Sequence, residues 1–374
     1  MEPFYPLHVR VCGQCLLAQL PEFVPPDEIF TEYAYFSSYS AAWLKHSEDY
    51  TAMIAERLAL GPGSFVVELA SNDGYLLQYF VRRGIPSLGI EPAANVARAA
   101  GEKGVETLVR FFGRELGEEL RAAGRQADLV IGNNVLAQVP DLNSFVAGIR
   151  LLLKPGGTAT LEFPHLLRLV EENQFDTIYH EHFSYFSLLA TERIFAASGL
   201  TLFDVEELWT HGGSLRVYVR PQEDSSRPVS SRVTALRDVE LAAGLSRPES
   251  YARFEERVRQ TKRKLLALLI GLKQDGKRIA GYGAPGKGNT LLNYCGIGPD
   301  FLDFTVDRNP YKQGKFLPGT HVPIYPPEHL DREKPDYIFI LPWNLKNEIV
   351  AQLDHARKWG ARFIVPIPEP EILP

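Results

Sequence analysis

Residues 64–74 read SFVVELASNDG, an apolar run that ends in small and polar residues. Three more apolar runs follow it, PSLGIEP at 86–92, ADLVIGNNVL at 127–136 and TATLEFP at 158–164, with helix-length segments between them. Strands that alternate with helices in this way predict a parallel sheet covered by helices on both faces. We therefore expect an α/β domain that binds its ligand beyond the carboxyl ends of the strands.

The ends of these strands carry residue types that a nucleoside cofactor needs. Small residues after the first strand allow close backbone approach, the following helix start can favour an anionic group, and an acid after the second strand can accept both ribose hydroxyls. The candidate cofactor residues are Glu68, Ala70, Asn72, Asp73, Gly74, Glu91, Pro92, Asn133 and Asn134. The alternative is a generic doubly wound domain whose acids only cap helices. A nicotinamide site is less natural, because the first turn lacks G-x-G-x-x-G.

A second α/β pattern begins at residue 278, with the apolar runs RIAGYG, FLDFTVD, DYIFIL and RFIVPI. We expect four strands with intervening helices, forming a smaller doubly wound domain. Gly281, Gly283 and Gly286 satisfy G-x-G-x-x-G, and Asp307 ends the next strand about twenty residues later, where a dinucleotide fold places its ribose acid. Gly288 stands where a P-loop has Ser or Thr, which disfavours ATP hydrolysis.

This glycine-rich turn suits a diphosphate, which backbone N–H groups, a helix N-terminus and Lys287 would hold. NAD and a nucleotide-diphosphate sugar are both candidates here, and glycines that only allow tight packing are the alternative. The later strand end at 341–344, LPWN, adds an aromatic and an amide, although a core Trp explains it equally well. The candidate binding residues of this domain are Tyr282, Gly283, Lys287, Asn289, Asp307, Trp343 and Asn344.

Residues 175–186, FDTIYHEHFSYF, place two histidines and an acid among tyrosines. A histidine that titrates near neutrality beside an orienting carboxylate suits removal of a proton next to a carbonyl. His182 is the better candidate for this base, and a structural role for His180 is an even alternative. The His-x-His spacing is also compatible with a metal, but no third ligand is evident.

Composition restricts the partners and the compartment. The chain carries 40 Lys and Arg against 46 Asp and Glu, a formal net charge of −6, without a dense basic block, so we expect no nucleic-acid partner. No apolar run reaches the roughly 18 residues of a membrane span, and the N-terminus lacks a signal-peptide layout. Cys12, Cys15 and Cys295 cannot form a disulfide framework, which favours a reducing, cytoplasmic location without membrane association.

Pattern changes divide the chain into four expected segments. They are an N-terminal lobe over 1–60, the first α/β domain over 61–220, a linker with a following helix over 221–273, and the second α/β domain over 274–374. LTLFDVEEL and SLRVYVR close the first domain as an antiparallel hairpin at the sheet edge. Residues 221–250, rich in Ser, Arg and Pro, are expected to be the linker, and Tyr251 to Leu272 an amphipathic helix. The sequence does not indicate an oligomeric state.

Several longer motifs are spread over essentially the whole chain. They are YPLHVRVCGQCLLAQL, YHEHFSYFS, HGGSLRVYV, GYGAPGKGNTLLNYCGI, VDRNPYKQGKFLPGTHVPI, LPWN and the segment from Tyr33 to His46. Together they resemble the sugar C-methyltransferases that act on nucleotide-diphosphate-linked 4-ketosugars, and the strand-end residues of the first domain resemble those of class I methyltransferases that use S-adenosylmethionine (SAM). The resemblance implies a Rossmann-like SAM domain, a C-terminal dinucleotide-binding-like α/β domain that holds the nucleotide sugar, and a small zinc-binding N-terminal lobe.

The resemblance also implies residue roles. His182 resembles the family's general base, which takes the proton at C3 beside the C4 ketone of a TDP-linked 4-keto-deoxyhexose. Tyr179 and Glu181 resemble its active-site partners, and Tyr33 a tyrosine from the N-terminal lobe. The enolate would attack the methyl group of SAM in line, so positioning and enolate stabilisation should contribute most of the rate. His180 and Gln138 are further candidate substrate contacts.

The chain departs from the family at two places. Gln138 stands where the family's N-N-V-x-A-H has histidine, and an amide can hydrogen-bond the substrate but cannot shuttle a proton at neutral pH. Structural zinc needs about four ligands, and Cys12 and Cys15 make half of such a site. The other half is expected before Met1, or the lobe folds without metal. Two other functions stay open: an NAD(P)-dependent nucleotide-sugar oxidoreductase that uses Gly281 to Gly286, and a non-catalytic nucleotide-sugar-binding protein.

Overall fold

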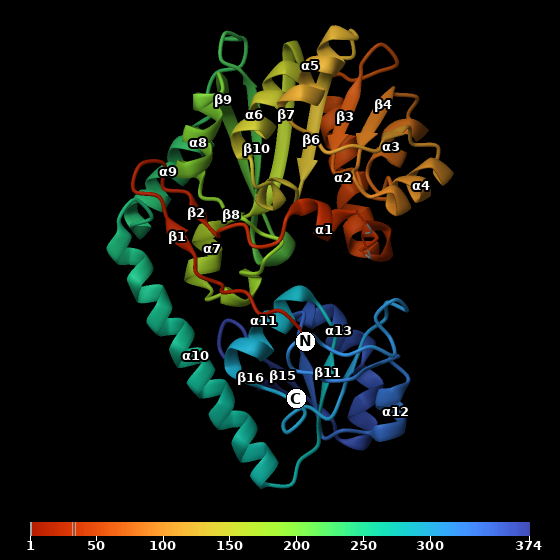
Figure 1. The fold of residues 1–374 in the computed structure, drawn as a ribbon, viewed down its shortest axis with the longest axis vertical. Coiled ribbons are helices and arrows are strands. Elements are labelled where there is room, and N and C mark those ends of the chain that lie inside the picture. Colours follow the sequence, from red (N-terminus) through yellow and green to blue (C-terminus); the bar gives the residue numbers. More distant parts are fainter. Residues whose placement is uncertain (1, 32, 34) are drawn as a thin grey trace. The chain divides into compact units, whose positions relative to one another are not determined.

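The computed structural model describes residues 2–31, 33 and 35–374, which fold as two compact units. The larger unit comprises residues 9–165 and 180–246, and the smaller unit comprises residues 2–8, 166–179 and 247–374. Each unit has its own sheet and its own hydrophobic core (Figure 1). None of the described helices is both long and apolar enough to span a bilayer.

The larger unit contains a seven-stranded sheet with the strand order β5-β4-β3-β6-β7-β10-β9. Its strands are β3 Val66–Leu69, β4 Ser87–Ile90, β5 Thr107–Leu108, β6 Ala127–Asn133, β7 Leu153–Pro164, β9 Leu200–Leu208 and β10 Ser214–Pro221. β3 to β7 pair in parallel, whereas β10 is antiparallel to both β7 and β9. The predicted parallel sheet and its antiparallel edge hairpin are therefore confirmed.

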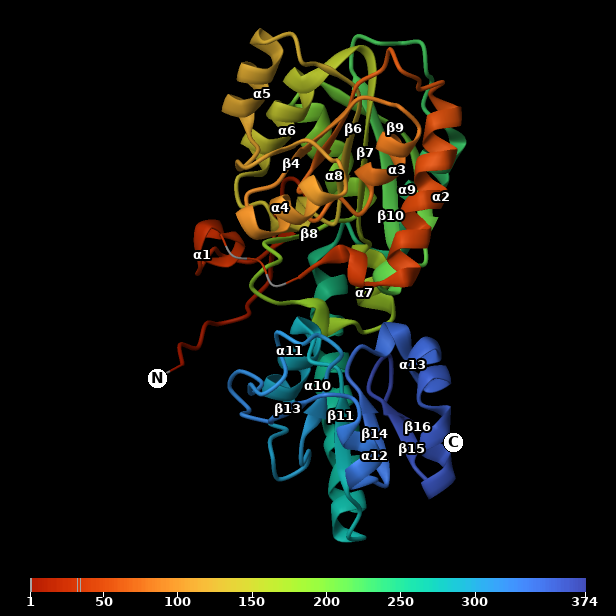
Figure 2. The same ribbon diagram turned by 90° about the vertical axis from the view of Figure 1, so that its right-hand side faces the viewer.

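Helices cover both faces of this sheet, with α2 and α5 on opposite sides of the strands (Figure 2). Tyr50 and Ile54 of α2 pack with Phe80 of α3 on one face, and Leu116 of α5 packs with Ile149 of α6 on the other. The helices of this unit are α1 Pro26–Phe30, α2 Ala41–Arg57, α3 Leu77–Arg82, α4 Ala94–Glu102, α5 Arg114–Ala122, α6 Leu142–Leu152, α8 Leu188–Ala197 and α9 Ser231–Ala243.

Helix α9 lies where the sequence predicted only a linker, so that prediction was wrong. The polar residues at its start are bound to one buried carboxylate: Ser230 Oγ donates to Asp204 Oδ1 at 2.6 Å, and Arg232 Nε donates to the same oxygen at 3.0 Å. Val233 and Leu236 are buried beneath the helix. The composition suggested a solvated segment because the pairing of these polar side chains with Asp204 is not visible in the local sequence.

A three-stranded sheet joins the N-terminal segment to the middle of the chain. Its strands are β1 Arg10–Val11, β2 Ala18–Gln19 and β8 Ser184–Tyr185, in the order β1-β2-β8. Ala18 lies opposite Tyr185 in an antiparallel pair. The N-terminal strands therefore hold the residues that directly follow the predicted catalytic segment.

The smaller unit contains a six-stranded sheet with the order β13-β12-β11-β14-β15-β16. Its strands are β11 Ile279–Tyr282, β12 Thr305–Val306, β13 Ile324–Tyr325, β14 Tyr337–Ile340, β15 Arg362–Val365 and β16 Glu371–Leu373, and its longer helices are α10 Pro248–Gln274, α11 Gly286–Cys295, α12 His329–Glu333 and α13 Lys346–Gln352. The four predicted strands are confirmed as β11, β12, β14 and β15. The short strands β13 and β16 were not predicted.

Residues 166–179 from the middle of the chain belong to the smaller unit. They form α7 Leu166–Glu171 and the 3-10 helix η3 Phe175–Thr177. Asn173 Nδ2 donates to Thr261 Oγ1 of α10 at 2.7 Å, and the Phe175 and Tyr294 rings meet with their centroids 5.3 Å apart. This segment packs on α10 and α11 and then leads directly into His180.

Candidate active site

The loop after β3 has a backbone shaped by left-handed residues and by one carboxylate. Ala70, Asn72 and Gly74 have φ values of 54°, 48° and 72°. Glu91 accepts the Asn72 N–H through Oε2 and the Ala93 N–H through Oε1, both at 2.9 Å. Glu91, which the sequence placed on the ribose, thus also holds the loop after the neighbouring strand in shape.

Buried polar atoms collect around this loop and at the end of β6. Asp73 Oδ1, both amide atoms of Asn133, and Asn134 Oδ1 are buried without a hydrogen-bond partner among the residues that the structure describes. Burial raises the pKa of Glu68 well above its ordinary value, opposed by a hydrogen bond from the Tyr75 hydroxyl. Buried polar groups without partners are rare and ask for a ligand or water. The predicted cofactor residues therefore form a polar, ligand-ready strand end.

Two of the predicted cofactor residues also hold neighbouring segments. Asn72 Oδ1 accepts the Ser37 N–H at 2.9 Å, and its Nδ2 donates to the Tyr35 carbonyl at 3.1 Å. Asp73 Oδ2 accepts a hydrogen bond from Lys103 Nζ at 2.9 Å. The aromatic-rich stretch before α2 is therefore attached to the loop after β3, while Pro92 follows Glu91 at the start of the next loop.

Tyr33 and Glu181, two predicted catalytic residues 148 positions apart, come together. The Tyr33 hydroxyl donates to Glu181 Oε2 at 3.4 Å. The Tyr33 backbone is held by Asn95 of α4, whose Oδ1 accepts the Tyr33 N–H at 3.2 Å and whose Nδ2 donates to the Tyr33 carbonyl at 2.7 Å. Sequence reasoning missed Asn95, although its position just after Glu91 and Pro92 was a signal.

The segment around His182 is fixed through its backbone. The Phe183 N–H donates to the Ala137 carbonyl at 2.7 Å, and the Leu20 N–H donates to the Phe183 carbonyl at 2.8 Å. The Tyr185 hydroxyl donates to the His182 carbonyl at 3.1 Å. His182 therefore lies on a segment bonded to the residue before Gln138, and its side chain is half-buried, as a base that meets a substrate must be.

His180 and Tyr179 precede this segment. The His180 ring lies edge-on to Phe23, with centroids 6.2 Å apart, within the larger unit. Tyr179 is the last residue of the smaller unit's mid-chain segment, and its ring atoms lie 3.6 to 3.8 Å from the place where a Cβ on Gly286 would be. A side chain on Gly286 would thus press on the predicted catalytic tyrosine.

A buried ion cluster at the end of β7 was not found by sequence reasoning. Glu162 Oε2 accepts from Arg216 Nη2 at 3.0 Å and lies 2.9 Å from His46 Nε2, and Glu162 Oε1 accepts from Thr210 Oγ1 at 2.8 Å. Burial raises the pKa of Glu162, but the hydrogen bond to His46 and the charge of Arg216 outweigh this effect and hold the pKa below its ordinary value. The Glu162 carbonyl accepts the Asn134 N–H at 2.7 Å, so the cluster borders the predicted cofactor residues. The motif HGGSLRVYV, which contains Arg216, was the available signal.

In the smaller unit, the glycine-rich turn is closed by the acid of the next strand. Gly283 has a φ of 90°, and a Cβ there would lie 2.7 Å from Pro342 Cδ. Asp307 accepts the Ala284 N–H through Oδ2 at 2.7 Å and the Asn309 N–H through Oδ1 at 2.8 Å. The sequence predicted that Asp307 binds ribose. In the structure Asp307 also holds the glycine-rich loop in shape, as Glu91 does for the loop after β3.

Lys287, Trp343 and Asn344 form one contact group at the start of α11. Lys287 Nζ donates to Asn344 Oδ1 at 2.8 Å and lies 4.7 Å from the centroid of the Trp343 ring. Burial lowers the pKa of Lys287, and the charge of Asp176 opposes this shift. A half-buried ammonium beside a glycine-rich turn and a helix N-terminus favours an anionic ligand.

Tyr282 and Asn289, the two remaining predicted binding residues of this unit, differ in whether their polar atoms are already hydrogen-bonded. Tyr282 is 7% exposed, and its hydroxyl donates to Gln352 Oε1 at 3.2 Å, which makes it a core side chain of β11. Asn289 Oδ1 is buried and lacks a partner within the described part of the chain. Asn289 lies one turn into α11, where its amide can still serve a ligand.

One relative matches along the whole chain. The C-methyltransferase NovU of Streptomyces niveus is 38% identical over 372 residues, which cover 100% of this chain and 88% of the relative. The chain belongs to the C-methyltransferase family. The family described as C-methyltransferase C-terminal domain matches residues 209–368 of this C-methyltransferase, and the family described as methyltransferase domain matches residues 43–205. Membership of this family rules out the two alternatives that the sequence had left open, a nucleotide-sugar oxidoreductase and a non-catalytic nucleotide-sugar-binding protein.

Solved structures resemble about half of the C-methyltransferase. The complex of DhpI with SAH is 23% identical, with a TM-score of 0.35, over 50% of this chain and 92% of that one. The PH0226 protein of Pyrococcus horikoshii is 16% identical, with a TM-score of 0.41, over 52% of this chain and 97% of that one.

SAM is the methyl donor of this C-methyltransferase. The residues present fit it, because Glu68, Asp73, Asn133 and Asn134 bring buried polar atoms to the ends of β3 and β6. Gly89 on β4 keeps the space open, since a Cβ there would lie 2.3 Å from Ser71 Oγ. The individual residue assignments stay predictions.

Among the described residues, the N-terminal lobe does not contain a complete zinc site. A zinc binding domain family matches residues 1–30, and the N–H groups of Cys15 and Gln14 hold the pKa of the Cys12 thiol below its ordinary value, as in a metal-binding turn. Within the described residues, however, no three His, Cys, Asp or Glu side chains gather to hold a metal. Two thiolates fall short of the roughly four ligands of structural zinc. The residues that the structure describes therefore do not complete a zinc site, and we assign zinc no role in the reaction.

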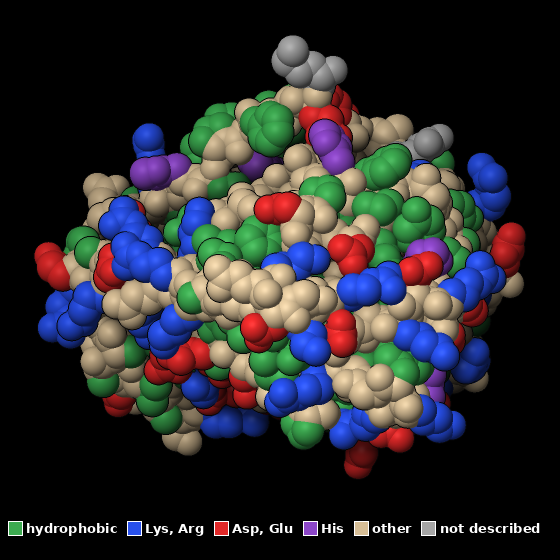
Figure 3. Space-filling model, turned by 90° about the horizontal axis from the view of Figure 1, so that it is seen from below, with side chains coloured by type: hydrophobic (Ala, Val, Ile, Leu, Met, Phe, Trp, Pro, Cys, Tyr) green, Lys and Arg blue, Asp and Glu red, His purple; other side chains and the backbone are tan. Residues whose placement is uncertain are grey.

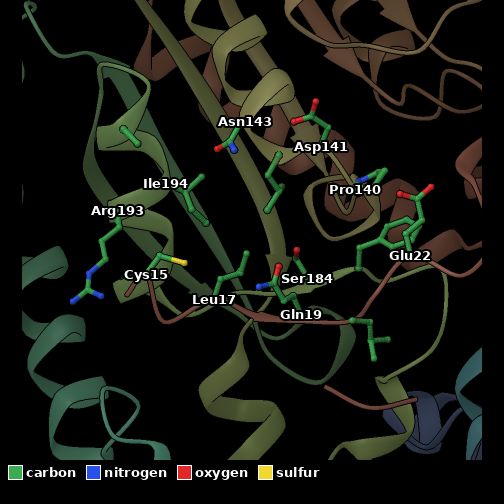
Figure 4. Close-up of a pocket in the computed structure, with 14 residues that line it drawn as sticks. Cys15, Leu17, Gln19, Glu22, Pro140, Asp141, Asn143, Ser184, Arg193 and Ile194 are labelled. Atoms are coloured by element: carbon green, nitrogen blue, oxygen red, sulfur yellow. The ribbon is translucent and has the colours of Figure 1, made fainter. Parts of the chain in front are cut away.

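A pocket of about 370 Å³ lies where the N-terminal strands meet α6 and α8 (Figure 4). Its lining includes Leu17, Gln19, Asp141, Ser184 and Arg193. Of the predicted site residues only Cys15 reaches it, so the pocket is separate from the predicted donor and catalytic residues.

Charges of both signs are mixed on the molecular face drawn in Figure 3, where Lys and Arg lie among Asp and Glu. Several charges of the smaller unit are paired, including Arg278 with Glu333 at 2.6 Å and Lys264 with Glu369 at 2.9 Å. The absence of a nucleic-acid partner stays a prediction.

Proposed function

We propose that this C-methyltransferase methylates C3 of a TDP-linked 4-keto-deoxyhexose, through an enolate formed by His182. The observation that carries the proposal is the Tyr33–Glu181 contact at 3.4 Å, directly beside His182 in the chain. It unites the N-terminal lobe with the segment that supplies the proposed base. The proposal also rests on membership of the C-methyltransferase family, which requires a carbon nucleophile.

The C4 ketone makes the neighbouring C3–H bond acidic, because the electron pair left by the proton spreads onto the ketone oxygen. The proton passes from C3 to the His182 imidazole, for which histidine is suited near neutral pH. SAM, when bound, supplies the methyl group that forms the new bond at C3. Tyr33 and Glu181 orient the base and the sugar, so that His182 meets one proton only.

Gln138 is proposed to hydrogen-bond the sugar without moving a proton. Ala137, its neighbour, accepts the Phe183 N–H at 2.7 Å, which places the two backbone segments side by side. A glutamine amide donates and accepts but does not ionise at neutral pH. The proton chemistry therefore depends on His182.

The smaller unit is proposed to hold the diphosphate of the substrate. Lys287 presents a half-buried ammonium, and α11 presents its first N–H groups at the glycine-rich turn. A diphosphate would supply the negative charge that this ammonium lacks from its two direct contacts, the Asn344 amide and the Trp343 ring.

The test incubates the protein with SAM and TDP-4-keto-6-deoxyglucose in heavy water, and follows methyl gain and deuterium at each sugar carbon. We expect a methyl group at C3, and deuterium at C3 when SAM is replaced by SAH. His182→Asn should abolish exchange and lower kcat by about 10²- to 10⁴-fold, with SAH binding retained. His355→Asn, an exposed histidine paired with Asp331 at 3.0 Å, is the control.

The two carbons beside the ketone, C3 and C5, make the outcomes distinguishable. A methyl group at C5 would refute the assignment of C3 as the methylated carbon and leave the reaction class intact. Undiminished exchange in His182→Asn would remove His182 as the base. No methyl gain on any 4-ketosugar would refute the substrate class.

A further inference from the structure

A buried carboxylate and a half-buried ammonium contact the same indole in the smaller unit. Trp343 Nε1 donates to Asp176 Oδ2 at 2.7 Å, while Lys287 Nζ lies 4.7 Å from the centroid of the same ring. Asp176 is fully buried and Trp343 is 6% exposed. The indole therefore has its N–H fixed by an anion and its face against a cation, which defines its orientation.

The same group is linked to the helix that begins at the glycine-rich turn. Lys287 is the second residue of α11 and also donates to Asn344 Oδ1 at 2.8 Å. The ammonium is thus held by two consecutive residues, Trp343 and Asn344, that follow β14. Any shift of Trp343 must move the cation that faces the proposed diphosphate.

Asp176 also belongs to the segment that carries the proposed catalytic tyrosine. It lies in η3, three residues before Tyr179, and the Tyr179 ring packs 3.6 to 3.8 Å from the Cβ position of Gly286. Thr290 Oγ1 of α11 donates to the Ile178 carbonyl at 3.3 Å. The first two turns of α11 therefore contact Ile178 and Tyr179 of this short segment.

We propose that Asp176 is a positioning residue that couples the nucleotide diphosphate to Tyr179. Through the Trp343 N–H it fixes the indole beneath Lys287, and through η3 it holds Tyr179 against the first turn of α11. A diphosphate that binds Lys287 then stabilises the segment 175–179 in its catalytic position. This inference rests on the proposed function for the identity of the diphosphate, a nucleoside diphosphate, and on the family resemblance for the role of Tyr179 as a partner of the base.

Trp343→Phe isolates the proposed link, because phenylalanine keeps an aromatic face for Lys287 and removes only the N–H that Asp176 accepts. Trp359→Phe is the matched control: Trp359 lies in the same unit, and its Nε1 donates to the Pro335 carbonyl at 3.1 Å, away from the turn. Thymidine 5′-diphosphate (TDP) serves as the probe, so methyl transfer is not needed for the first measurement.

The first measurement is hydrogen exchange at the amides of Thr177 and Ile178, which donate to the carbonyls of Gln174 and Phe175 at 3.1 Å each. TDP should slow their exchange in the unmodified chain and in Trp359→Phe. In Trp343→Phe we expect TDP to bind with affinity reduced by no more than about threefold, and the protection to be lost. Equal protection in Trp343→Phe, or no protection by TDP in the unmodified chain, would overturn the coupling.

The second measurement is kcat and KM for the 4-ketosugar at saturating SAM. Loss of a hydrogen bond to a charged group corresponds to about a tenfold to a hundredfold change, and we expect it in kcat rather than in KM. A change confined to KM would overturn the role in positioning Tyr179. If the unmodified chain methylates no 4-ketosugar, the proposed function fails, and hydrogen exchange still decides the coupling.

Discussion

The buried carboxyl group of Asp176 should make the free energy of unfolding depend on pH, and Asp176→Asn should remove that dependence. Burial raises the pKa of Asp176 from 3.8 to about 6, opposed by the charge of Lys287 and the Trp343 N–H. A carboxyl group with a raised pKa binds its proton more tightly in the folded state. Its contribution to stability is therefore fully present below about pH 4 and is lost as the pH rises to about 6. The shift corresponds to about 3 kcal/mol, at about 1.4 kcal/mol for each pKa unit.

The measurement is urea unfolding of both proteins at about pH 4.5, 6 and 7.5, followed by tryptophan fluorescence. The free energy of unfolding of Asp176→Asn, minus that of the unmodified chain, should rise by about 2 kcal/mol between about pH 4.5 and 7.5, because about 1 kcal/mol of the full shift already lies below about pH 4.5. A constant packing cost of the amide cancels in this comparison. In Trp343→Phe the pH-dependent range should extend upward, because the carboxylate loses its indole donor. A difference that stays constant with pH would refute the assignment of a buried, titrating Asp176.

Two further predictions concern the larger unit. Gly89→Ala places a Cβ 2.3 Å from Ser71 Oγ and 2.9 Å from Ser71 Cβ, so the loop after β3 must shift. The affinity for SAH, measured by calorimetry, should fall about tenfold. Unchanged affinity would show that the donor site does not depend on the packing of Gly89 against this loop. Glu162→Gln leaves the buried Arg216 without its closest carboxylate, at 3.0 Å, and should lower the free energy of unfolding by about 3 to 5 kcal/mol. A loss below about 1 kcal/mol, the range of solvent-exposed ion pairs, would refute the assignment of an uncompensated buried charge to Arg216 in this variant.

The sheets were predictable because their strands are long enough to leave a pattern. β3 and β6 are buried on both faces and appear as apolar runs. β13 has only two residues, Ile324 and Tyr325, and a single parallel partner, so its sequence is too short to show the pattern of a strand. The helix α9 was hidden for a different reason, since Ser230 and Arg232 satisfy a carboxylate far away in the sequence.

The site was predictable where one strand end supplies all the residues, and not where distant segments meet. Glu68 to Gly74 and Gly281 to Lys287 are continuous stretches whose chemistry is local. Glu162 meets His46 and Arg216, which are 116 and 54 positions away, and His46 alone looks like a polar residue of an amphipathic helix. Asp176 meets Trp343 across 167 positions, and only the packing of η3 on the smaller unit brings them together.

In both units, a carboxylate after one strand accepts a backbone N–H from the loop after the neighbouring strand. An acid at a strand end therefore predicts a structural role as well as a ribose contact. Glu91 after β4 accepts the Asn72 N–H from the loop after β3, and Asp307 after β12 accepts the Ala284 N–H from the loop after β11. Each carboxylate then takes a second N–H two residues further along its own chain. An ionised carboxylate has about four acceptor positions, so two backbone donors leave room for ribose hydroxyls. The acid thus sets the shape of the neighbouring loop before any ligand binds, and it can do so while the lone pairs that a ribose would need remain available.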